Sequence, residues 1–201
     1  MKIIYFNEIS STQLKLLEDI KLGLVYPPVC YYSDYQTNGI GSRGNKWIGK
    51  RGNLFFSFCY KKENFLDVPI QSLSIYFGWI FKKTLNELGS NVIMKWPNDI
   101  YLNKKIGGVI TNLIKDNIIC GIGLNTKFSP SDEFTHLDIE VKNDKILQRF
   151  FSKLSQNIKW QEVINEYKKE FDQTKKIFNI NANLLSDGSL ELNNKRMYSK
   201  R

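Results

Sequence analysis

Short β-prone runs separated by turn-forming breaks fill the middle of the chain, and they constrain its fold more than any other feature. Each run is rich in Ile, Val, Phe or Tyr: Leu54–Tyr60, Val92–Trp96, Ile100–Asn103, Ile106–Ile114 and Ile118–Asn125. Two more such runs lie nearer the N-terminus, at residues 2–6 and Val29–Tyr35. The Lys104-Lys105 break between two of the runs is a hairpin signal. The sequence therefore predicts a mixed, mostly antiparallel sheet.

Two segments with apolar residues at helical spacing accompany these strands. The first begins at the N-cap candidates Ser10 and Ser11 and ends at Gly23, and the second opens at Pro69 and closes at Gly89. A polar N-cap and a C-terminal glycine satisfy the backbone groups that a helix leaves unpaired at its ends. We therefore expect a helix in each segment.

The C-terminal part of the chain predicts one long helix and a small β element. Apolar residues recur mostly every three or four positions from Ile146 to about Phe178, which favours a single helix. Beyond it, Asp187-Gly188 is a hairpin turn signal. Together with the strands, these segments indicate an α+β fold in which helices flank the sheet.

Composition excludes several other classes of protein. With 42% hydrophobic and 24% charged residues, the chain is too apolar for a disordered protein. No apolar run approaches the ~20 residues of a membrane span, and the N-terminus lacks the apolar core of a secretion signal. Three scattered cysteines and one histidine, His136, form neither a zinc motif nor a disulfide framework. We expect a cytoplasmic protein with no membrane partner.

The net charge of +9 is weak evidence for nucleic-acid binding. Lys supplies 24 of the 29 basic residues, while Asn and Ile occur 20 and 23 times, a joint excess typical of AT-rich coding sequences. Arginine, whose planar fork suits phosphates and bases best, occurs only five times. A basic nucleic-acid-binding module stays open as an alternative, and it would bind DNA with a steep salt dependence.

The segment Gln36–Asn53 has no periodicity but five glycines, at positions 39, 41, 44, 49 and 52. Six basic residues and no acidic residue lie between Asp34 and Glu63. Glycine backbone can approach a ligand closely, and successive amides can hold an anion, so the segment suits a phosphate or a nucleotide. A mobile surface loop is the alternative. Trp47 disfavours it, because an indole is costly to expose and can stack on a base.

Three shorter motifs near the ends of predicted strands are further candidates. KWPND at residues 95–99 ends a strand with a carboxylate that could carry Mg²⁺ beside a polyphosphate, or it is a simple turn. KKIGG at residues 104–108 offers one inward-pointing lysine, or it is a solvated hairpin tip. GIGLN at residues 121–125 places glycines inside a strand, which marks a close approach to the backbone or a bulge.

In their order and spacing, QTNGIGSRGNKW, KWPNDIYLNKKIGG and GIGLNT resemble the catalytic domain of biotin–protein ligases. Ser11-Thr12-Gln13 fits the Ser-Thr-Asn/Gln motif that opens this family's first helix. The resemblance covers roughly residues 5–125, and KWPND followed by K-x-G-G is rarely found outside the family. It implies the biotin/lipoate ligase fold, which is similar to that of class II synthetases.

The resemblance also implies an activity. Biotin and ATP, with Mg²⁺, would form biotinyl-5′-AMP and pyrophosphate. The biotinyl group would then pass to one lysine of a biotin carboxyl carrier protein, such as that of acetyl-CoA carboxylase. A lipoate or octanoate ligase of the same fold is the alternative within the superfamily.

Each matching residue takes a role from the same resemblance. Lys105 and Arg43 would be catalytic, and strand alternation favours Lys105 over Lys104 as the inward lysine. Biotin would contact Ser11, Thr12, Gln13, Gln36, Gly39, Ile40, Gly41, Ser42, Lys105, Gly107, Gly108 and Gly123. ATP would contact Arg43, Lys46, Trp47, Lys95, Asn98, Asp99 and Asn125, with Asp99 as the Mg²⁺ ligand.

The glycine-rich loop departs from the family's usual G-R-G-R-x-G-R-x-W pattern. Ile40, Ser42 and Asn45 stand where three arginines are usual. Ser42 takes the position of the arginine that usually steadies biotin and the phosphate. The loss of that arginine would weaken retention of the adenylate unless Lys46, Lys50 or Arg51 compensates. The departure also leaves a catalytically inactive relative open as an alternative.

The resemblance implies a division into two parts. Residues 1–176 would form the catalytic domain, and residues 177–201 would be a reduced form of the SH3-like barrel that usually follows it. No helix-turn-helix segment precedes Met1, so we expect the form of the family that does not bind DNA. The carrier domain is the expected protein partner, and the sequence leaves monomer and homodimer open.

Overall fold

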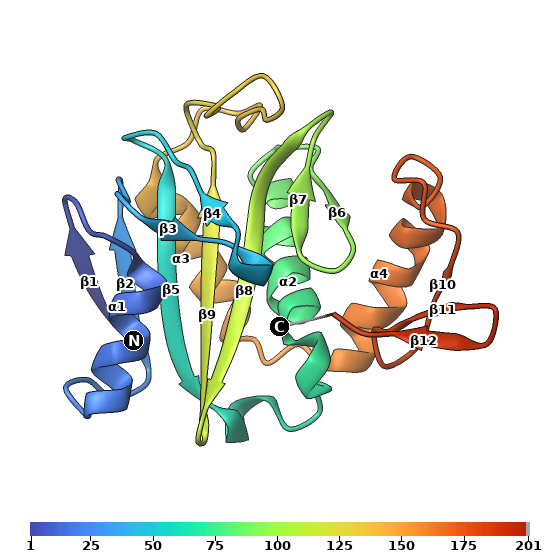
Figure 1. The fold of residues 1–201 in the computed structure, drawn as a ribbon, viewed down its shortest axis with the longest axis horizontal. Coiled ribbons are helices and arrows are strands. Elements are labelled where there is room, and N and C mark those ends of the chain that lie inside the picture. The colour runs from blue at the N-terminus through green and yellow to red at the C-terminus, as the bar shows by residue number, and fades with distance from the viewer. Residues whose placement is uncertain (200–201) are drawn as a thin grey trace. The chain divides into compact units, whose positions relative to one another are not determined.

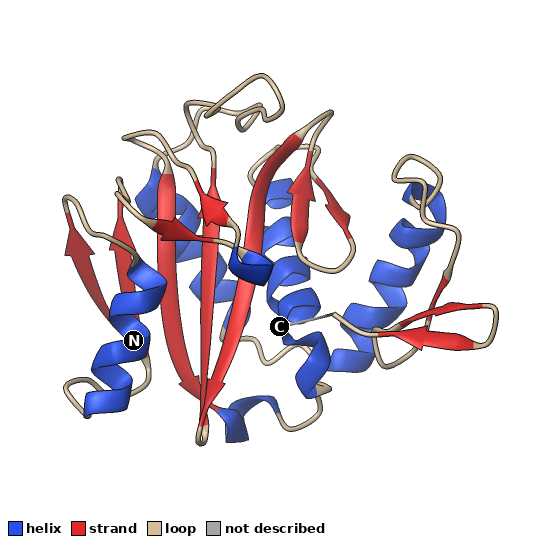
Figure 2. Ribbon diagram, viewed as in Figure 1, coloured by secondary structure: helices blue, strands red, loops and turns tan. Residues whose placement is uncertain are grey.

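The computed structural model describes residues 1–199 (Figure 1). Within them the chain forms two compact units. The first unit contains Met1–Leu66 and Asn103–Leu137, and the described part of the second contains residues 67–102 and 138–199. Each unit contains both helices and strands (Figure 2), which confirms the predicted α+β class. None of the helices in residues 1–199 is long and apolar enough to cross a membrane.

The first unit is built on a mixed sheet. Its elements are β1 (Lys2–Phe6), α1 (Thr12–Leu22), β2 (Val29–Ser33), β3 (Gly39–Ile40), β4 (Lys46–Trp47), β5 (Leu54–Lys61), β8 (Lys105–Ile114) and β9 (Asn117–Leu124), with 3₁₀ turns at Ser42–Gly44 and Lys62–Phe65. Within this unit the sheet runs in the order β1-β2-β5-β9-β8. β1 and β2 pair in parallel, whereas β2–β5, β5–β9 and β9–β8 pair antiparallel. The predicted mixed, mostly antiparallel sheet is confirmed.

Helix α1 has the ends that its sequence predicts. Ser11 is the N-cap, and its hydroxyl accepts a hydrogen bond from the Leu14 N–H. Gly23 ends the helix with φ of 72°, a left-handed conformation that a side chain would strain. The helix packs against β2, β5 and β9, and Leu16 is buried among Val29 and its neighbours in the core of this unit. α1 is therefore fixed against the middle of the sheet, so its first turn is held in place.

Three neighbouring strands of this sheet each carry one cysteine. Cys30 on β2, Cys59 on β5 and Cys120 on β9 are buried and free. Burial raises the pKa of the Cys59 thiol to about 12 and raises the pKa of the other two as well. A thiolate is the reactive form of cysteine, so these three side chains act as small apolar core residues.

The second unit is mainly helical. Its elements are α2 (Leu73–Glu87), β6 (Ile93–Lys95), β7 (Asp99–Tyr101), α3 (Asn143–Leu154), α4 (Trp160–Thr174), β10 (Asn183–Leu184), β11 (Leu190–Leu192) and β12 (Lys195–Met197), with a 3₁₀ turn at Ile70–Ser72. α2 packs against α3, α4 and β6. Aromatic rings join the helices: the centroids of Phe81 and Phe150 lie 5.5 Å apart, and those of Trp79 and Tyr167 lie 5.4 Å apart. The core of this unit therefore depends on aromatic packing around α2.

The prediction of one helix from Ile146 to Phe178 is wrong, because the chain breaks between α3 and α4. Asn157 adopts φ of 52° there, a left-handed conformation that Asn tolerates better than most residues. The Ile158 carbonyl accepts a hydrogen bond of 2.7 Å from the Tyr76 hydroxyl, and the Asp67 carboxylate accepts one of 2.8 Å from the Trp160 N–H at the start of α4. The partners that stabilise the break lie far away in the sequence.

Two smaller expectations also change. The predicted loop Gln36–Asn53 contains the short antiparallel pair β3–β4, which two-residue strands cannot signal by periodicity. The hairpin turn at Asp187-Gly188 is confirmed, with Gly188 at φ of 82°, but β10, β11 and β12 form a three-stranded antiparallel sheet rather than a strand pair. The division into functional parts at residues 176 and 177 stays a prediction.

Candidate functional site

The first turn of α1 carries a buried polar cluster. The Thr12 N–H and its hydroxyl both donate to Oε1 of Gln36, at 2.7 and 3.0 Å. The same hydroxyl lies 2.9 Å from the Ser57 hydroxyl, while Ser11 caps the helix and is almost fully buried. The structure thus brings together Ser11, Thr12 and Gln36. Sequence reasoning missed Ser57, although a lone serine in the apolar run LFFSFCY was a usable signal.

Gln13, also predicted to contact biotin, has an amide that is bound inside the first unit. Its Nε2 donates to Oδ1 of Asn112 at 2.9 Å and to the Ile119 carbonyl at 3.4 Å. A β-carbon on Gly121 would lie only 2.5 Å from Oε1 of Gln13. This glycine therefore makes room for the glutamine, which ties α1 to β8 and β9.

The β3–β4 hairpin closes over the sheet of the first unit (Figure 1). Gly39 on β3 faces Trp47 on β4, and a β-carbon at Gly39 would lie 2.6 Å from the Trp47 carbonyl oxygen and 2.8 Å from Nε2 of Gln36. Only a bare backbone fits at this position. The hairpin therefore joins the polar cluster at α1 to the tryptophan of the glycine-rich loop.

Trp47, Gly123 and Lys105 form the other half of the candidate site. A β-carbon on Gly123 would lie 2.6 Å from Cε2 and 2.8 Å from Nε1 of Trp47, so the indole rests directly on this strand glycine. Nζ of Lys105 lies 5.6 Å from the centre of the Trp47 ring, within the range of a cation–π interaction. Nε1 of Trp47 is buried and has no partner within the described chain. Gly108 pairs with Gly123 across β8 and β9, so a second bare backbone position lies beside the one on which the indole rests.

The neighbouring Lys104 has a different environment. Its side chain is exposed and donates to the Asp132 carbonyl. Lys105 is half-buried and lies above the tryptophan. Lys105, rather than Lys104, therefore lies beside the loop tryptophan, at the start of β8 and two residues before Gly107. Its role in the site stays a prediction.

The turn between β3 and β4 presents the remaining loop residues. The Gly41 N–H donates to the Asn45 carbonyl at 2.7 Å, and Ser42–Gly44 forms a 3₁₀ turn with Arg43 at φ of 59°. Arg43 and Lys46 are exposed. Ile40 faces Lys46 across the hairpin. Two of the four basic residues of the loop thus lie in this turn, Arg43, or just after it, Lys46.

Arg51, a candidate to replace the missing loop arginines, is bound elsewhere. Its guanidinium donates to Glu8 at 2.5 Å and to the Asn7 carbonyl at 3.3 Å. It also lies over the Tyr35 ring, 4.6 Å from the ring centre. Compensation by Arg51 would therefore require these three contacts to break.

Asn125, predicted to lie near ATP, is fully buried. Its Oδ1 accepts from Nδ2 of Asn53 at 3.2 Å, and its Nδ2 donates to the Thr135 carbonyl at 3.1 Å. Asn53, also fully buried, accepts from the N–H groups of Lys127 and Phe128. The Asn53–Asn125 pair orders the chain after β9. Its contact with a nucleotide stays a prediction, and no sequence pattern identified Asn53.

The KWPND residues belong to the second unit. Nζ of Lys95 lies 5.3 Å from the centres of both the Tyr101 and the Phe178 rings. Asn98 and Asp99 are half-buried, and Asp99 begins β7. Within residues 1–199 there is no group of three or more His, Cys, Asp or Glu side chains that could hold a metal ion.

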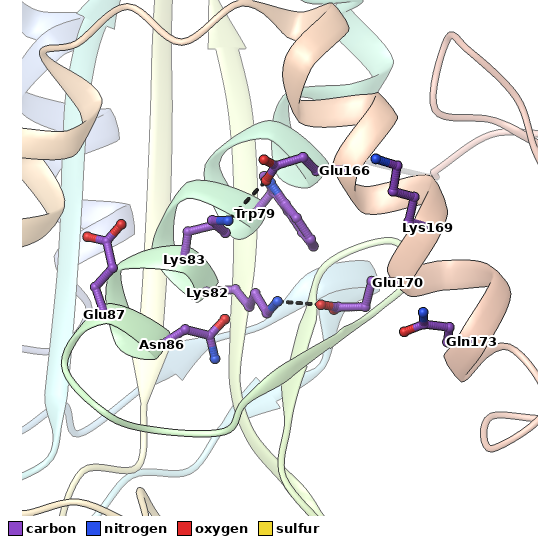
Figure 3. A pocket seen from close by; sticks show the side chains of 9 residues that line it. All are labelled: Trp79, Lys82, Lys83, Asn86, Glu87, Glu166, Lys169, Glu170 and Gln173. Atoms are coloured by element: carbon purple, nitrogen blue, oxygen red, sulfur yellow. Dashed lines mark hydrogen bonds and ion pairs between the residues drawn. The ribbon is translucent and has the colours of Figure 1, made fainter.

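A charged hollow in the second unit lies between α2 and α4 (Figure 3). Lys82 and Glu170 form an ion pair there, with side chains only 10% and 13% exposed. Nζ of Lys82 also lies 4.5 Å from the centre of the Trp79 ring, and Oε1 of Glu170 accepts from the Met94 N–H at 2.8 Å. The central charges of this hollow are bound to one another, and Glu170 also fixes β6, which leads into KWPND.

The fold is an α+β domain whose first unit carries a loop-covered cationic site on a mixed sheet. The model of the biotin/lipoate A/B protein ligase family matches residues 5–125. The chain belongs to this family.

Similar proteins agree with this assignment. The chain is 35% identical to the biotin acetyl coenzyme A carboxylase synthetase of Helicobacter pylori, solved with bound biotinylated ATP; 98% of this chain and 99% of that one are covered, with a TM-score of 0.91. It is 27% identical to the Aquifex aeolicus biotin protein ligase in complex with biotin and ATP, over 84% and 78% of the two chains, with a TM-score of 0.73.

A curated relative is much longer than the region it shares with this chain. The bifunctional ligase/repressor BirA of Escherichia coli (strain K12) is 32% identical over an alignment of 125 residues that covers 58% of this chain and 38% of BirA. The chain therefore matches well under half the length of that relative.

Proposed function

We propose that the chain is an ATP-dependent biotin–protein ligase. The observation that carries the proposal is the Lys105 ammonium group above the Trp47 ring, which rests on the bare backbone of Gly123. A fixed cation at a glycine-lined surface can stabilise a carboxylate and a phosphate together. Two related structures hold biotin with ATP, or biotinylated ATP, which supports the same substrates here.

The polar cluster at α1 suits the ureido ring of biotin, which has two N–H donors and one carbonyl acceptor. The hydroxyls of Ser11 and Thr12 can both donate and accept. Gln36 accepts from Thr12 with Oε1, which leaves its Nε2 as a donor for the ureido oxygen. Gly39 keeps the hairpin backbone close to this cluster. These residues would set the position of biotin, and Gln13 would support them by tying α1 to β8 and β9.

The first step joins biotin to the nucleotide. A carboxylate oxygen of biotin attacks the α-phosphorus of ATP, the bond from this phosphorus to the bridging oxygen breaks, and pyrophosphate leaves with the electron pair. Both reactants are anions, so Lys105 and Arg43 would lower the barrier by neutralising charge as it gathers on the phosphate. Closure of the hairpin that bears Trp47 would keep water from the mixed anhydride.

The nucleotide would be held by loop and motif residues. Lys46 would lie near the phosphates, and Trp47 beside the base. Lys95, Asn98 and Asp99 are the further nucleotide contacts that the resemblance implies. Mg²⁺ in nucleotide sites is usually held by phosphate oxygens with one or two carboxylates, so the single half-buried carboxylate of Asp99 fits this donor set. The ion would supply charge neutralisation at the phosphates.

The second step transfers the biotinyl group. The uncharged amine of a carrier lysine attacks the anhydride carbonyl, an amide bond forms, and AMP leaves as the carbonyl–oxygen bond breaks. The amine loses one proton to solvent. We propose a biotin carboxyl carrier protein, such as that of acetyl-CoA carboxylase, as the acceptor. The cytoplasmic location and the lack of DNA binding stay predictions, and both a monomer and a homodimer stay open.

Biotin-dependent exchange between ATP and labelled pyrophosphate tests the first step. The parent protein should catalyse exchange with biotin and not with lipoate or octanoate. Lys105→Ala should lower exchange by about 100-fold to 1,000-fold, the usual effect of removing one group that stabilises developing charge. Lys104→Ala is the matched control, because Lys104 is the adjacent lysine and is bound to the Asp132 carbonyl at the surface; it should retain nearly full exchange.

The outcomes separate the alternatives. A parent protein without exchange would overturn the ligase proposal and favour an inactive relative. Exchange with lipoate instead of biotin would assign the chain to the other branch of the family. Equal losses in Lys104→Ala and Lys105→Ala would remove the specific role of Lys105.

A further inference from the structure

Three consecutive backbone carbonyls in the C-terminal hairpin accept hydrogen bonds from three different parts of the second unit. The Ser186 carbonyl accepts from Nε1 of Trp160 at 2.9 Å, at the start of α4. The Asp187 carbonyl accepts from the Ser72 hydroxyl at 2.5 Å, at the start of α2. The Gly188 carbonyl accepts from Nε1 of Trp96 at 2.9 Å. One turn therefore joins two helices and the KWPND motif.

The turn is closed by hydrogen bonds between its own residues. Oδ1 of Asp187 accepts from the N–H and from the hydroxyl of Ser189, at 3.0 and 2.6 Å, and Ser189 is almost fully buried. The Leu185 N–H donates to the Ser189 carbonyl at 2.9 Å, and the Gly188 N–H donates to the Leu185 carbonyl at 3.0 Å. The Gly188 carbonyl is therefore held in a fixed direction toward Trp96.

Gly188 also fits its site closely. Its φ of 82° is unfavourable for any residue with a side chain. A β-carbon there would overlap Oγ of Ser72 and would lie 3.0 Å from Cδ1 of Ile75 on α2. A methyl group at position 188 would therefore push the turn away from α2, and the carbonyl that holds Trp96 would move with it.

The residues that precede Trp96 also contact α4 and the segment that follows it. The residue before Lys95, Met94, donates its N–H to Glu170 on α4, and Lys95 lies against Phe178, just beyond α4. Within KWPND, Lys95 and Trp96 thus both contact residues beyond Thr174. The C-terminal segment supports the motif rather than merely following the helices.

We infer that the Ser186–Gly188 turn is a positioning element for the KWPND motif, which it holds through the Trp96 indole, and that it thereby sets the affinity for ATP. This inference rests on the proposed function only in taking KWPND as a nucleotide contact. Trp96 and Gly188 are positioning residues in this scheme: neither needs to touch the reacting atoms. Their effect should appear in ATP binding and not in biotin binding.

Two matched tryptophan substitutions test the inference. Trp96→Phe and Trp160→Phe each remove one indole N–H that donates to a carbonyl of the same turn at 2.9 Å. A merely structural role predicts the same small loss of thermal stability and the same affinities for both. The inference predicts that only Trp96→Phe weakens ATP binding, by about threefold to tenfold, the equivalent of one net hydrogen bond.

Gly188→Ala perturbs the hydrogen bond between Trp96 and the Gly188 carbonyl from the acceptor's side, and it leaves the KWPND sequence unchanged. It should weaken ATP binding to a similar degree, which separates positioning from any direct contact of Trp96 with the nucleotide. Circular dichroism and thermal unfolding identify a variant that has not folded. In that case Asp187→Ala, which removes the acceptor of both Ser189 hydrogen bonds and so loosens the turn itself, replaces it and should also weaken ATP binding.

The dissociation constants of ATP and of biotin are measured separately by calorimetry on the full chain, so turnover is not required. Weaker ATP binding in Trp96→Phe and in the turn variant, with unchanged biotin binding and a parent-like Trp160→Phe, supports the inference. Parent-like ATP binding in the turn variant overturns it, as does an equal loss in Trp160→Phe. A parent protein that binds ATP but lacks exchange activity contradicts the ligase proposal alone; one that does not bind ATP overturns both.

Discussion

One added methyl group at Gly123 tests how the loop tryptophan holds Lys105. The β-carbon of Gly123→Ala would lie 2.6 Å from Cε2 of Trp47, whereas non-bonded carbon atoms lie about 3.5–4.0 Å apart. Gly123 pairs with Phe55 on one side and with Gly108 on the other, so the strand stays in place. The ring, carried by a short hairpin, must therefore move by about 1 Å to restore an ordinary contact.

The displaced ring no longer supports the ammonium group. A cation–π interaction contributes about 0.5–2 kcal/mol, which corresponds to about twofold to 30-fold in a rate or binding constant. We expect Gly123→Ala to lower kcat/KM in biotin-dependent pyrophosphate exchange by about tenfold. The free energy of unfolding should fall by less than about 1 kcal/mol, because the hairpin yields instead of the core.

A double variant refines the test. Without the ring, the methyl group at position 123 meets no obstacle, so Gly123→Ala/Trp47→Ala should be as active as Trp47→Ala alone. A double variant that is tenfold less active than Trp47→Ala would refute the reasoning. It would indicate that position 123 must stay bare for another reason, such as direct approach of the substrate.

Two further predictions concern stability. Lys82→Met should lower the free energy of unfolding, measured in urea, by about 3 kcal/mol, because it leaves the Glu170 carboxylate buried without its cation. Adding Glu170→Gln removes that charge and keeps an acceptor for the Met94 N–H, so the double variant should recover at least half of the loss. A double variant that recovers nothing would contradict the pairing of Lys82 with Glu170. Burial alone would raise the pKa of Asp19, but hydrogen bonds from Lys15 and Tyr31 outweigh it and hold the pKa below its usual value. Asp19 therefore adds stability that is present above about pH 4 and is lost as the pH falls through its lower folded pKa. The stability difference between the parent and Asp19→Asn should be constant near neutral pH and should shrink in acid, and a pH-independent difference would argue against this account.

Local sequence patterns predicted the elements whose stability is local. The Ser11 cap, the Gly23 stop and the Asp187-Gly188 turn all depend on the conformations of neighbouring residues, so composition and spacing identified them. The sheet followed from consecutive β-prone runs. In contrast, the break between α3 and α4 keeps the apolar spacing almost intact, because Leu154 and Ile158 are four residues apart.

The candidate site divides in the same way. Glycines at which a side chain would not fit beside Trp47, such as Gly39 and Gly123, can be recognised from the sequence. Polar partners do not: Asn53 and Asn112 acquire their roles only through residues 72 and 99 positions away. The three carbonyls of the C-terminal turn carry no sequence signal, since every residue has a carbonyl and only the fold aims it.

The three buried thiols have a practical consequence. Cys30, Cys59 and Cys120 are shielded by the sheet, and burial raises the pKa of each. Maleimides and similar reagents react with the thiolate, so the three native cysteines should react with them only very slowly. A single cysteine placed in the exposed turn of the β3–β4 hairpin could then carry a fluorophore without prior removal of the natural cysteines. Because the three natural cysteines are buried in the core, they would not compete with a cysteine introduced in the loop for the labelling reagent.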